Sequence, residues 1–307
     1  MKHQPITTAL PQSPWQLYRR GDYLVGSFTA MASPCELLMD TVDLALGQSL
    51  TELAWRECQR IEAKFSRYKP DNLMAKLNAS NGKPVSLDAE THSLLSFAQT
   101  CFELSEGMFD ITSGVLRRAW TFDGSDRLAE ANAVEALLPL IGWNKVTLDN
   151  HSLTLQPGME LDLGGIGKEY AVDRVSQLCQ QQAPELSVVV NFGGDIQVTR
   201  PRRHQAFWQI GIENPDPTSP APLILQIRGG GLATSGDARR FLLKDGVRYS
   251  HILNPKTGYP IINAPRSVTV AAGHCTQAGL LATLALLHGD EARTFLDQQG
   301  VKYWLLN

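Results

Sequence analysis

Two neighbouring segments, Ala233-Thr-Ser-Gly-Asp-Ala-Arg-Arg-Phe241 and Arg248-Tyr-Ser-His-Ile-Leu-Asn-Pro-Lys-Thr-Gly258, carry small, polar and cationic residues without amphipathic order. The Lys-Asp-Gly turn at 244–246 joins them and predicts a β-hairpin. Hydroxyls, guanidinium groups and backbone donors near Gly236 would then lie close together, a combination that suits a phosphate or pyrophosphate. His251 is the one side chain of this hairpin that titrates near neutral pH. A polar hairpin with a satisfied histidine is the alternative interpretation.

Two further glycine-rich turns lie upstream of this hairpin. The segment Leu161-Asp-Leu-Gly-Gly-Ile-Gly-Lys-Glu-Tyr-Ala-Val-Asp173 predicts a strand that runs through a turn into a helix. Its small residues would let an anion approach backbone amides at the helix N-terminus, where Lys168 could reach it. Val188-Val-Val-Asn-Phe-Gly-Gly-Asp-Ile196 predicts a buried strand that ends in a second such turn. Each turn could also be purely structural, with the glycine pair at 193–194 forming a β-bulge.

The periodicity of apolar residues predicts a mixed fold. We expect an α+β class with a large, mostly antiparallel sheet and packed helices, in which residues 1–20 form an N-terminal extension and 21–307 a single domain. The Pro-rich stretch 214–222 reads as a surface loop between strands. Helices are expected near 48–65, 88–105, 129–141, 167–182, 276–288 and 290–299, a hairpin at 146–155, and strands near 22–29, 34–39, 186–199, 206–213, 222–228, 231–235, 266–272 and 301–306.

Composition restricts the partners and the compartment. The formal net charge is −3 and there is no long basic run, so we expect no nucleic-acid partner. Hydrophobic residues make up 43% of the chain, and we expect no transmembrane segment. The five cysteines are an odd, widely spaced set without a CxxC pair, which predicts reduced thiols. Residues 1–11 contain neither an apolar signal-peptide core nor a lipobox cysteine, from which we expect a cytoplasmic location.

Taken together, the motifs resemble those of the ApbE-like FAD:protein FMN transferases, in the family's order over roughly residues 26–290. The resemblance implies an ApbE-like, T-fold-related architecture with a ligand cleft between two interleaved subdomains. A match of this many ordered motifs is far more specific than a lone glycine motif. The matching segments are 65–71, 109–114 with Trp120 and Phe122, 162–168, 170–173, 191–196, 233–237, 249–252, 255–258 and 267–270.

The reaction that this resemblance implies is a phosphoryl transfer. A Thr or Ser hydroxyl of an acceptor flavoprotein attacks the FMN-side phosphorus of FAD, a phosphoester bond forms, and AMP leaves. His251 is the candidate general base, or alternatively a group that orients the substrate. Two other functions stay open, a metal-dependent FAD pyrophosphatase that uses water and a non-catalytic FAD-binding protein.

The resemblance also implies the residues of the site. Those expected to contact FAD are Met31, Tyr68, Asp110, Ile111, Thr112, Lys168, Asp237 and Ile252. Mg²⁺ is expected to be bound by the backbone carbonyl near Gly165 and by the hydroxyl of Thr283.

Two departures from the family's pattern stand out. The usual Met-Gly-Thr is Met31-Ala-Ser here, which keeps a small residue and a hydroxyl. The usual Ala-Asp-Ala-Leu-Ala-Thr is Ala278-Gly-Leu-Leu-Ala-Thr283, so Gly279 replaces an expected carboxylate ligand. Since Mg²⁺ prefers hard oxygen ligands that include a carboxylate, we expect a weakened metal site that Gly279→Asp would strengthen.

Overall fold

The computed structural model describes residues 13–213, 223–237 and 241–306, so the stretch 214–222, predicted to be a surface loop, and the two arginines 239 and 240 lie outside the described residues. At its centre is an eight-stranded sheet in which every neighbouring pair is antiparallel. This confirms the expected α+β class. The strands in spatial order are β1 (Trp15–Arg20), β2 (Tyr23–Ala30), β3 (Ser33–Met39), β7 (Val188–Phe192), β8 (Asp195–Val198), β11 (Gly230–Gly236), β14 (Ser267–Ala272) and β15 (Lys302–Leu306).

Two strands of the large sheet differ from the sequence prediction. The prediction of one strand over 186–199 is wrong, because Gly193 and Gly194 take φ angles of +63° and +101° and reverse the chain between β7 and β8. Such angles suit glycine, which has no Cβ to clash with the backbone. Residues 15–20, expected to belong to an extension, form β1 and pair with β2 along their whole length.

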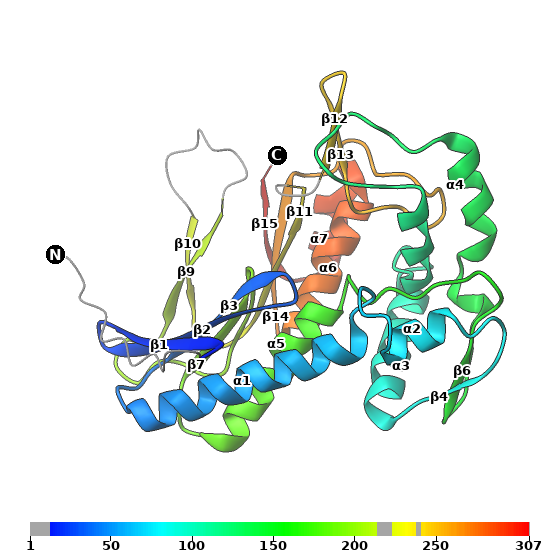
Figure 1. The fold of residues 1–307 in the computed structure, drawn as a ribbon. Helices are drawn as coiled ribbons and strands as arrows, with labels where there is room; N and C mark the ends of the chain where they lie inside the picture. The colour runs from blue at the N-terminus through cyan, green and yellow to red at the C-terminus, as the bar shows by residue number, and fades with distance from the viewer. Residues whose placement is uncertain (1–12, 214–222, 238–240, 307) are drawn as a thin grey trace.

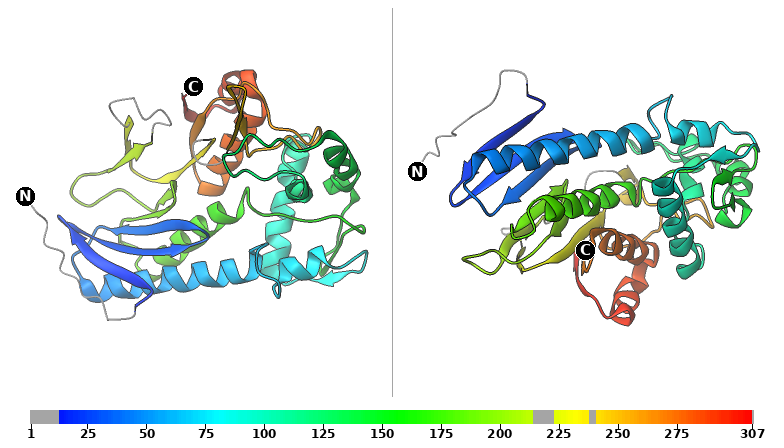
Figure 2. Two further views of the ribbon diagram at one scale, coloured as in Figure 1. Left: turned by 45° about the horizontal axis from the view of Figure 1, so that its top comes forward. Right: turned by 90° about the horizontal axis from the view of Figure 1, so that it is seen from below.

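Three helices cover one face of the sheet, α1 (Leu44–Phe65), α5 (Gly167–Gln182) and α6 (Cys275–Leu287) (Figures 1 and 2). Asp43 caps α1 by accepting hydrogen bonds from the backbone N–H groups of residues 45 and 46. The N-terminus of α6 is capped from another helix, because Asp173 of α5 accepts from the N–H groups of Cys275 and Thr276 at 2.9 Å each. This contact fixes α5 against α6. The helix α7 (Ala292–Gln299) packs on α6.

A hairpin of β9 (Trp208–Ile212) and β10 (Leu223–Ile227) has its own small core. In β9, buried residues alternate with exposed ones, the pattern of a strand with one covered face. Trp208 and Leu225 join a cluster with Val189 and Leu232 of the large sheet. The hairpin therefore packs on the large sheet through these side chains.

The remaining elements form a second region beside the sheet, visible on the right of Figure 1. Its core includes Leu116, Val134 and Leu242, and Trp120 Nε1 donates a hydrogen bond to the carbonyl of Gly258 at 2.8 Å. These contacts join the segment after residue 110 to the predicted hairpin. The hairpin is confirmed for its part at 241–250, which forms β12 and β13. Residues 233–236, expected to belong to it, lie instead in β11 and pair with β14 of the large sheet. The elements are α2 (Leu73–Asn78), β4 (Val85–Ser86), α3 (Ala89–Leu104), η1 (Ile111–Arg118), α4 (Ala131–Leu137), η2 (Leu138–Leu140), η3 (Trp143–Lys145), β5 (Thr147–Leu148), β6 (Ser152–Thr154), β12 (Phe241–Lys244) and β13 (Val247–Ser250). The short helix η4 (Gly289–Glu291) lies between α6 and α7 and contacts both.

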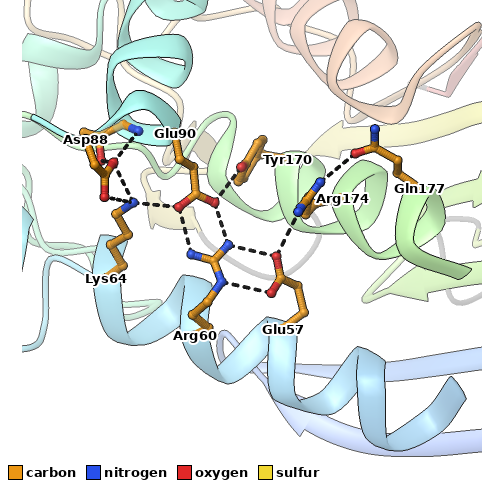
Figure 3. Close-up of polar contacts among 9 residues, drawn as sticks. Glu57, Arg60, Lys64, Asp88, Glu90, Tyr170, Arg174 and Gln177 are labelled. Atoms are coloured by element: carbon orange, nitrogen blue, oxygen red, sulfur yellow. Dashed lines mark hydrogen bonds and ion pairs between the residues drawn. The ribbon is translucent and has the colours of Figure 1, made fainter. Parts of the chain in front are cut away.

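A network of charged side chains connects α1, α3 and α5 (Figure 3). Arg60 of α1 lies between Glu57 of the same helix and Glu90 of α3, and Lys64 also bonds Glu90 at 2.6 Å. Tyr170 of α5 donates its hydroxyl proton to Glu90 at 2.7 Å. The network thus ties the helices on the sheet to the second region.

All five cysteines lie in described parts of the chain. All five cysteines are buried and unpaired. In the described ranges no helix is both long enough and apolar enough to cross a membrane.

Candidate functional site

The glycine-rich turn before α5 is held in place by Asp162. This carboxylate accepts a hydrogen bond from the N–H of Gly164 at 2.9 Å and forms an ion pair with Arg67. The preceding motif packs directly against it, since a Cβ on Gly114 would lie 2.5 Å from the Cβ of Asp162. Gly165 abuts the ring of Phe109 in the same way, with 3.2 Å to a Cβ. Two segments that are distant in sequence therefore meet at the start of α5.

Lys168 has a protein partner in the structure. Its Nζ lies 2.8 Å from a carboxylate oxygen of Asp195, which is buried at the start of β8. Burial lowers the pKa of Lys168, but the charge and hydrogen bond of Asp195 outweigh it and hold the pKa above its ordinary value. A Cβ on Gly193 would stand 3.7 Å from Nζ. The ammonium group therefore sits beside the β7–β8 turn, where it remains partly exposed to an incoming anion.

Glu169 is a residue that the sequence reasoning missed. It follows Lys168 in the first turn of α5, yet only 8% of it is exposed. Burial, followed by the charge of Asp195, raises the pKa of Glu169 to about 8. The only sequence signal was a carboxylate beside the conspicuous Lys168, in a position that looked like a solvated helix start.

The helix α6 brings Gly279 and Thr283 to the same region. Residues four apart share a helix face, and a Cβ on Gly279 would lie 2.7 Å from the Cγ of Glu169. The hydroxyl of Thr283 is 3.0 Å from that of Ser235 on β11. Lys168, Glu169, Thr283 and Ser235 thus gather where α5, α6 and the sheet meet.

Asp110, Ile111 and Thr112 form the start of η1. One carboxylate oxygen of Asp110 accepts from the N–H and the hydroxyl of Thr112, and the other accepts from the N–H of Trp143. Burial raises the pKa of Asp110, although these bonds oppose it. The carbonyl of Ile111 accepts from the N–H of Asp162 at 2.8 Å. The three residues therefore fix the segment beside the glycine-rich turn.

Met31 and Tyr68 lie on loops of different character. Met31 sits in the β2–β3 turn with a φ of +50°, and its N–H donates to Glu62 of α1 at 2.9 Å. Tyr68 is 74% exposed, with the guanidinium of Arg67 stacked 4.9 Å from its ring centre. An exposed aromatic ring of this kind is available for stacking on a planar ligand.

The predicted hairpin contributes a second group of candidates. Asp237 pairs with Arg248 at 2.6 Å and lies 3.6 Å from Arg266. His251 meets the ring of Phe122 edge-on at 6.4 Å, and Phe122 is stacked on Trp120. Ile252 is half-buried, and its N–H donates to Ser250. These residues form an aromatic and cationic wall beside the end of β11.

No set of three or more His, Cys, Asp or Glu side chains in the described ranges is arranged to hold a metal ion. A groove of about 440 Å³ lies between α1 and α5, lined by none of the predicted site residues. Its walls are Ser49, Glu52, Leu53, Arg56, Glu57, Arg60, Leu178 and Gln182.

The sequence of this chain is similar to that of a known protein family over most of its length. The ApbE family model matches residues 31–305. An FAD:protein FMN transferase of Treponema pallidum is 31% identical over 89% of this chain and 79% of its own length. One from Vibrio cholerae is 31% identical over 77% of this chain and 72% of its own.

Solved structures agree. The ApbE protein of Thermotoga maritima superposes with a TM-score of 0.83 at 29% identity, covering 92% of this chain and 94% of that one. The flavin transferase ApbE of Vibrio cholerae gives 0.80 at 27% identity, covering 92% of each chain. Because the family model matches residues 31–305, well over half of the sequence, this chain belongs to the ApbE family.

Proposed function

We propose that this chain is an FAD:protein FMN transferase that attaches FMN to a Thr or Ser hydroxyl of an acceptor flavoprotein and releases AMP. The observation that carries the proposal is the match of the ApbE family over residues 31–305. The geometry supports it, because the β7–β8 turn at Gly193 lies beside Lys168 at the start of α5, directly after the glycine-rich turn. The relatives with this name cover most of the chain, which makes transfer the activity to test first.

The roles of the residues follow from their positions. Tyr68 and Met31 would contact the flavin ring, and Lys168 would attract the pyrophosphate while Asp195 keeps it charged. His251 would accept the proton of the attacking hydroxyl. The new phosphorus–oxygen bond forms to the acceptor, and the bond between phosphorus and the AMP oxygen breaks.

Further contacts to FAD come from the two groups of candidates already described. Asp110, Ile111 and Thr112 would present the edge of η1 to the nucleotide, while Asp237 and Ile252 would line the hairpin side.

The residues present fit a magnesium ion. A buried carboxylate oxygen of Glu169 lacks a hydrogen-bond partner in the described chain, and the hydroxyl of Thr283 lies on the neighbouring helix. These are hard oxygen donors, and the carbonyl of Gly165 would add a third. Bound there, Mg²⁺ would neutralise charge on the phosphate oxygens.

The test is incubation of the protein with FAD, Mg²⁺ and a Thr-containing acceptor protein. Flavin fluorescence that stays on the denatured acceptor, with one AMP released per flavin, is the expected result. Release of FMN and AMP without labelling of the acceptor would instead mean a pyrophosphatase. FAD that is bound but intact would mean a carrier.

A further inference from the structure

The side chain of Glu169 fills the space that a residue larger than glycine would occupy at position 279. A Cβ on Gly279 would lie 2.7 Å from Cγ, 2.9 Å from Oε1 and 3.2 Å from Cδ of Glu169. The two residues belong to different helices, α5 and α6, which pack against each other. A carboxylate is therefore present beside α6 at this point, and it comes from the neighbouring helix.

This carboxylate is poorly compensated by the protein. More than nine-tenths of Glu169 is buried, and its Oε2 has no hydrogen-bond partner in the described part of the chain. The adjacent residue in the sequence, Lys168, is a cation, but it is paired with Asp195. Asp173, a further carboxylate of α5, is engaged by the N-terminus of α6. Since an isolated buried carboxylate is costly, a cation bound to Glu169 would be stabilising.

Two hydroxyl groups lie in the same part of the structure, on α6 and on β11. Thr283 lies one helical turn after Gly279 and so faces the side of α6 that meets Glu169. Its hydroxyl contacts that of Ser235 at 3.0 Å. Mg²⁺ is often bound by one or two carboxylates, the rest of its shell being water and substrate phosphate. A single carboxylate with neighbouring hydroxyls is thus a sufficient protein contribution.

We propose that Glu169 is the carboxylate ligand of the divalent cation in this protein, reaching from α5 to the place beside Gly279, with Thr283 as its partner on α6. This inference rests on the proposed function for the identity of the ion and of the nucleotide. It changes the expectation drawn from the sequence. The carboxylate expected at position 279 is supplied by Glu169 of the neighbouring helix, so the metal site keeps its negative charge.

The proposal reverses the expected effect of Gly279→Asp. An aspartate there would place its Cβ within 3 Å of Glu169, which would have to move. Two carboxylates would then share one buried space and repel each other. The single substitution should therefore leave cation binding no tighter. The double variant Glu169→Gly, Gly279→Asp exchanges the two positions and should retain binding.

The experiment is a titration of the full chain with Mn²⁺, followed by electron paramagnetic resonance, with and without FAD. Glu169→Gln keeps the shape and removes the charge, and it should weaken Mn²⁺ binding roughly ten-fold or more. Glu103→Gln, an exposed residue of α3, is the matched control and should bind like the parent. Circular dichroism should show that each variant is folded. We expect this for Glu169→Gln because the substitution removes a buried charge, which is costly to the fold.

Two results would overturn the proposal: Mn²⁺ binding by Glu169→Gln equal to that of the parent, or no Mn²⁺ binding by the parent in either condition. The readout is independent of transfer. A parent that transfers FMN while Glu169→Gln binds Mn²⁺ normally refutes the ligand and keeps the function. A parent that never transfers, but whose Mn²⁺ binding depends on Glu169, keeps the ligand and refutes the function.

Discussion

The residues of the site form two groups, and substitutions in each group should affect different properties. Glu169 and Asp195 are buried and Lys168 is half-buried, and the charges of the three groups depend on one another. His251 follows β13 of the hairpin and meets the ring of Phe122 edge-on. Substitutions in the first group should change stability and ion binding together. Substitutions in the second should change turnover with little cost to the fold.

We predict that His251→Ala lowers the rate of FMN transfer by roughly 10²-fold while changing the dissociation constant of FAD little, because it removes the proposed general base. Single-turnover labelling of the acceptor and an equilibrium FAD titration measure the two quantities. His151→Ala, at an exposed turn between β5 and β6, is the matched control. Unchanged turnover at saturating FAD and acceptor would reject the base. Loss confined to FAD affinity would favour an orienting role.

We predict that Lys168→Met destabilises the protein by about 3 kcal/mol, because it leaves Asp195 buried without its cation. The double variant Lys168→Met, Asp195→Asn should recover more than half of that loss. Urea unfolding followed by tryptophan fluorescence gives both values. A double variant no more stable than the single one would mean that the ion pair does not govern the effect.

At the scale of elements, helix packing positions the site. Asp173 of α5 caps α6, and Glu90 of α3 receives bonds from α1 and α5 (Figure 3). The hydrogen bond from Arg60 contributes most to holding the pKa of Glu90 at about 2, with Lys64 and Tyr170 assisting against partial burial. A folded pKa below the ordinary 4.5 means that Glu90 stabilises the fold above that pH.

The corresponding prediction concerns acid unfolding. Glu90→Gln should cost about 1 kcal/mol at pH 7, a modest value because the pairs are partly exposed and Arg60 keeps Glu57. The difference from the parent should shrink as the pH falls from about 4.5 to about 2, where Glu90 itself becomes protonated. Urea midpoints at a series of pH values test this. A gap that stays constant over that range would contradict the assignment.

At the scale of the whole molecule, two regions share the candidate site. The sheet with α5 and α6 supplies Lys168, Glu169 and Thr283, while the second region with β12 and β13 supplies Asp110 and His251. Trp120 bonded to Gly258 connects segments of the second region. A ligand that contacts both parts should therefore stabilise the molecule as a unit.

We predict that FAD at about a hundred times its dissociation constant raises the thermal midpoint by about 5 °C, as binding worth about 2.7 kcal/mol would in a protein of this size. Riboflavin at the same concentration should raise it much less, because it lacks the pyrophosphate that Lys168 would attract. Differential scanning fluorimetry measures the two midpoints, with a readout that flavin does not disturb. Equal shifts for both ligands would show that the phosphates are not recognised.

The sequence by itself predicted much of the architecture. Alternating apolar residues predicted most strands of the large sheet, and the Lys-Asp-Gly turn predicted the β12–β13 hairpin. The motifs predicted the family that the comparisons establish. These features depend on residues close in sequence, whose spacing follows the period of a strand or the geometry of a turn.

Only the tertiary structure decided how the helices supply the site. The sequence shows that Gly279 and Thr283 share a face of α6, but not that this face meets Glu169 of α5. It shows Lys168 at a helix start, but not that Asp195 at the start of β8 pairs with it. Periodicity fixes which residues of one helix lie together, whereas packing fixes which residues of another element they meet.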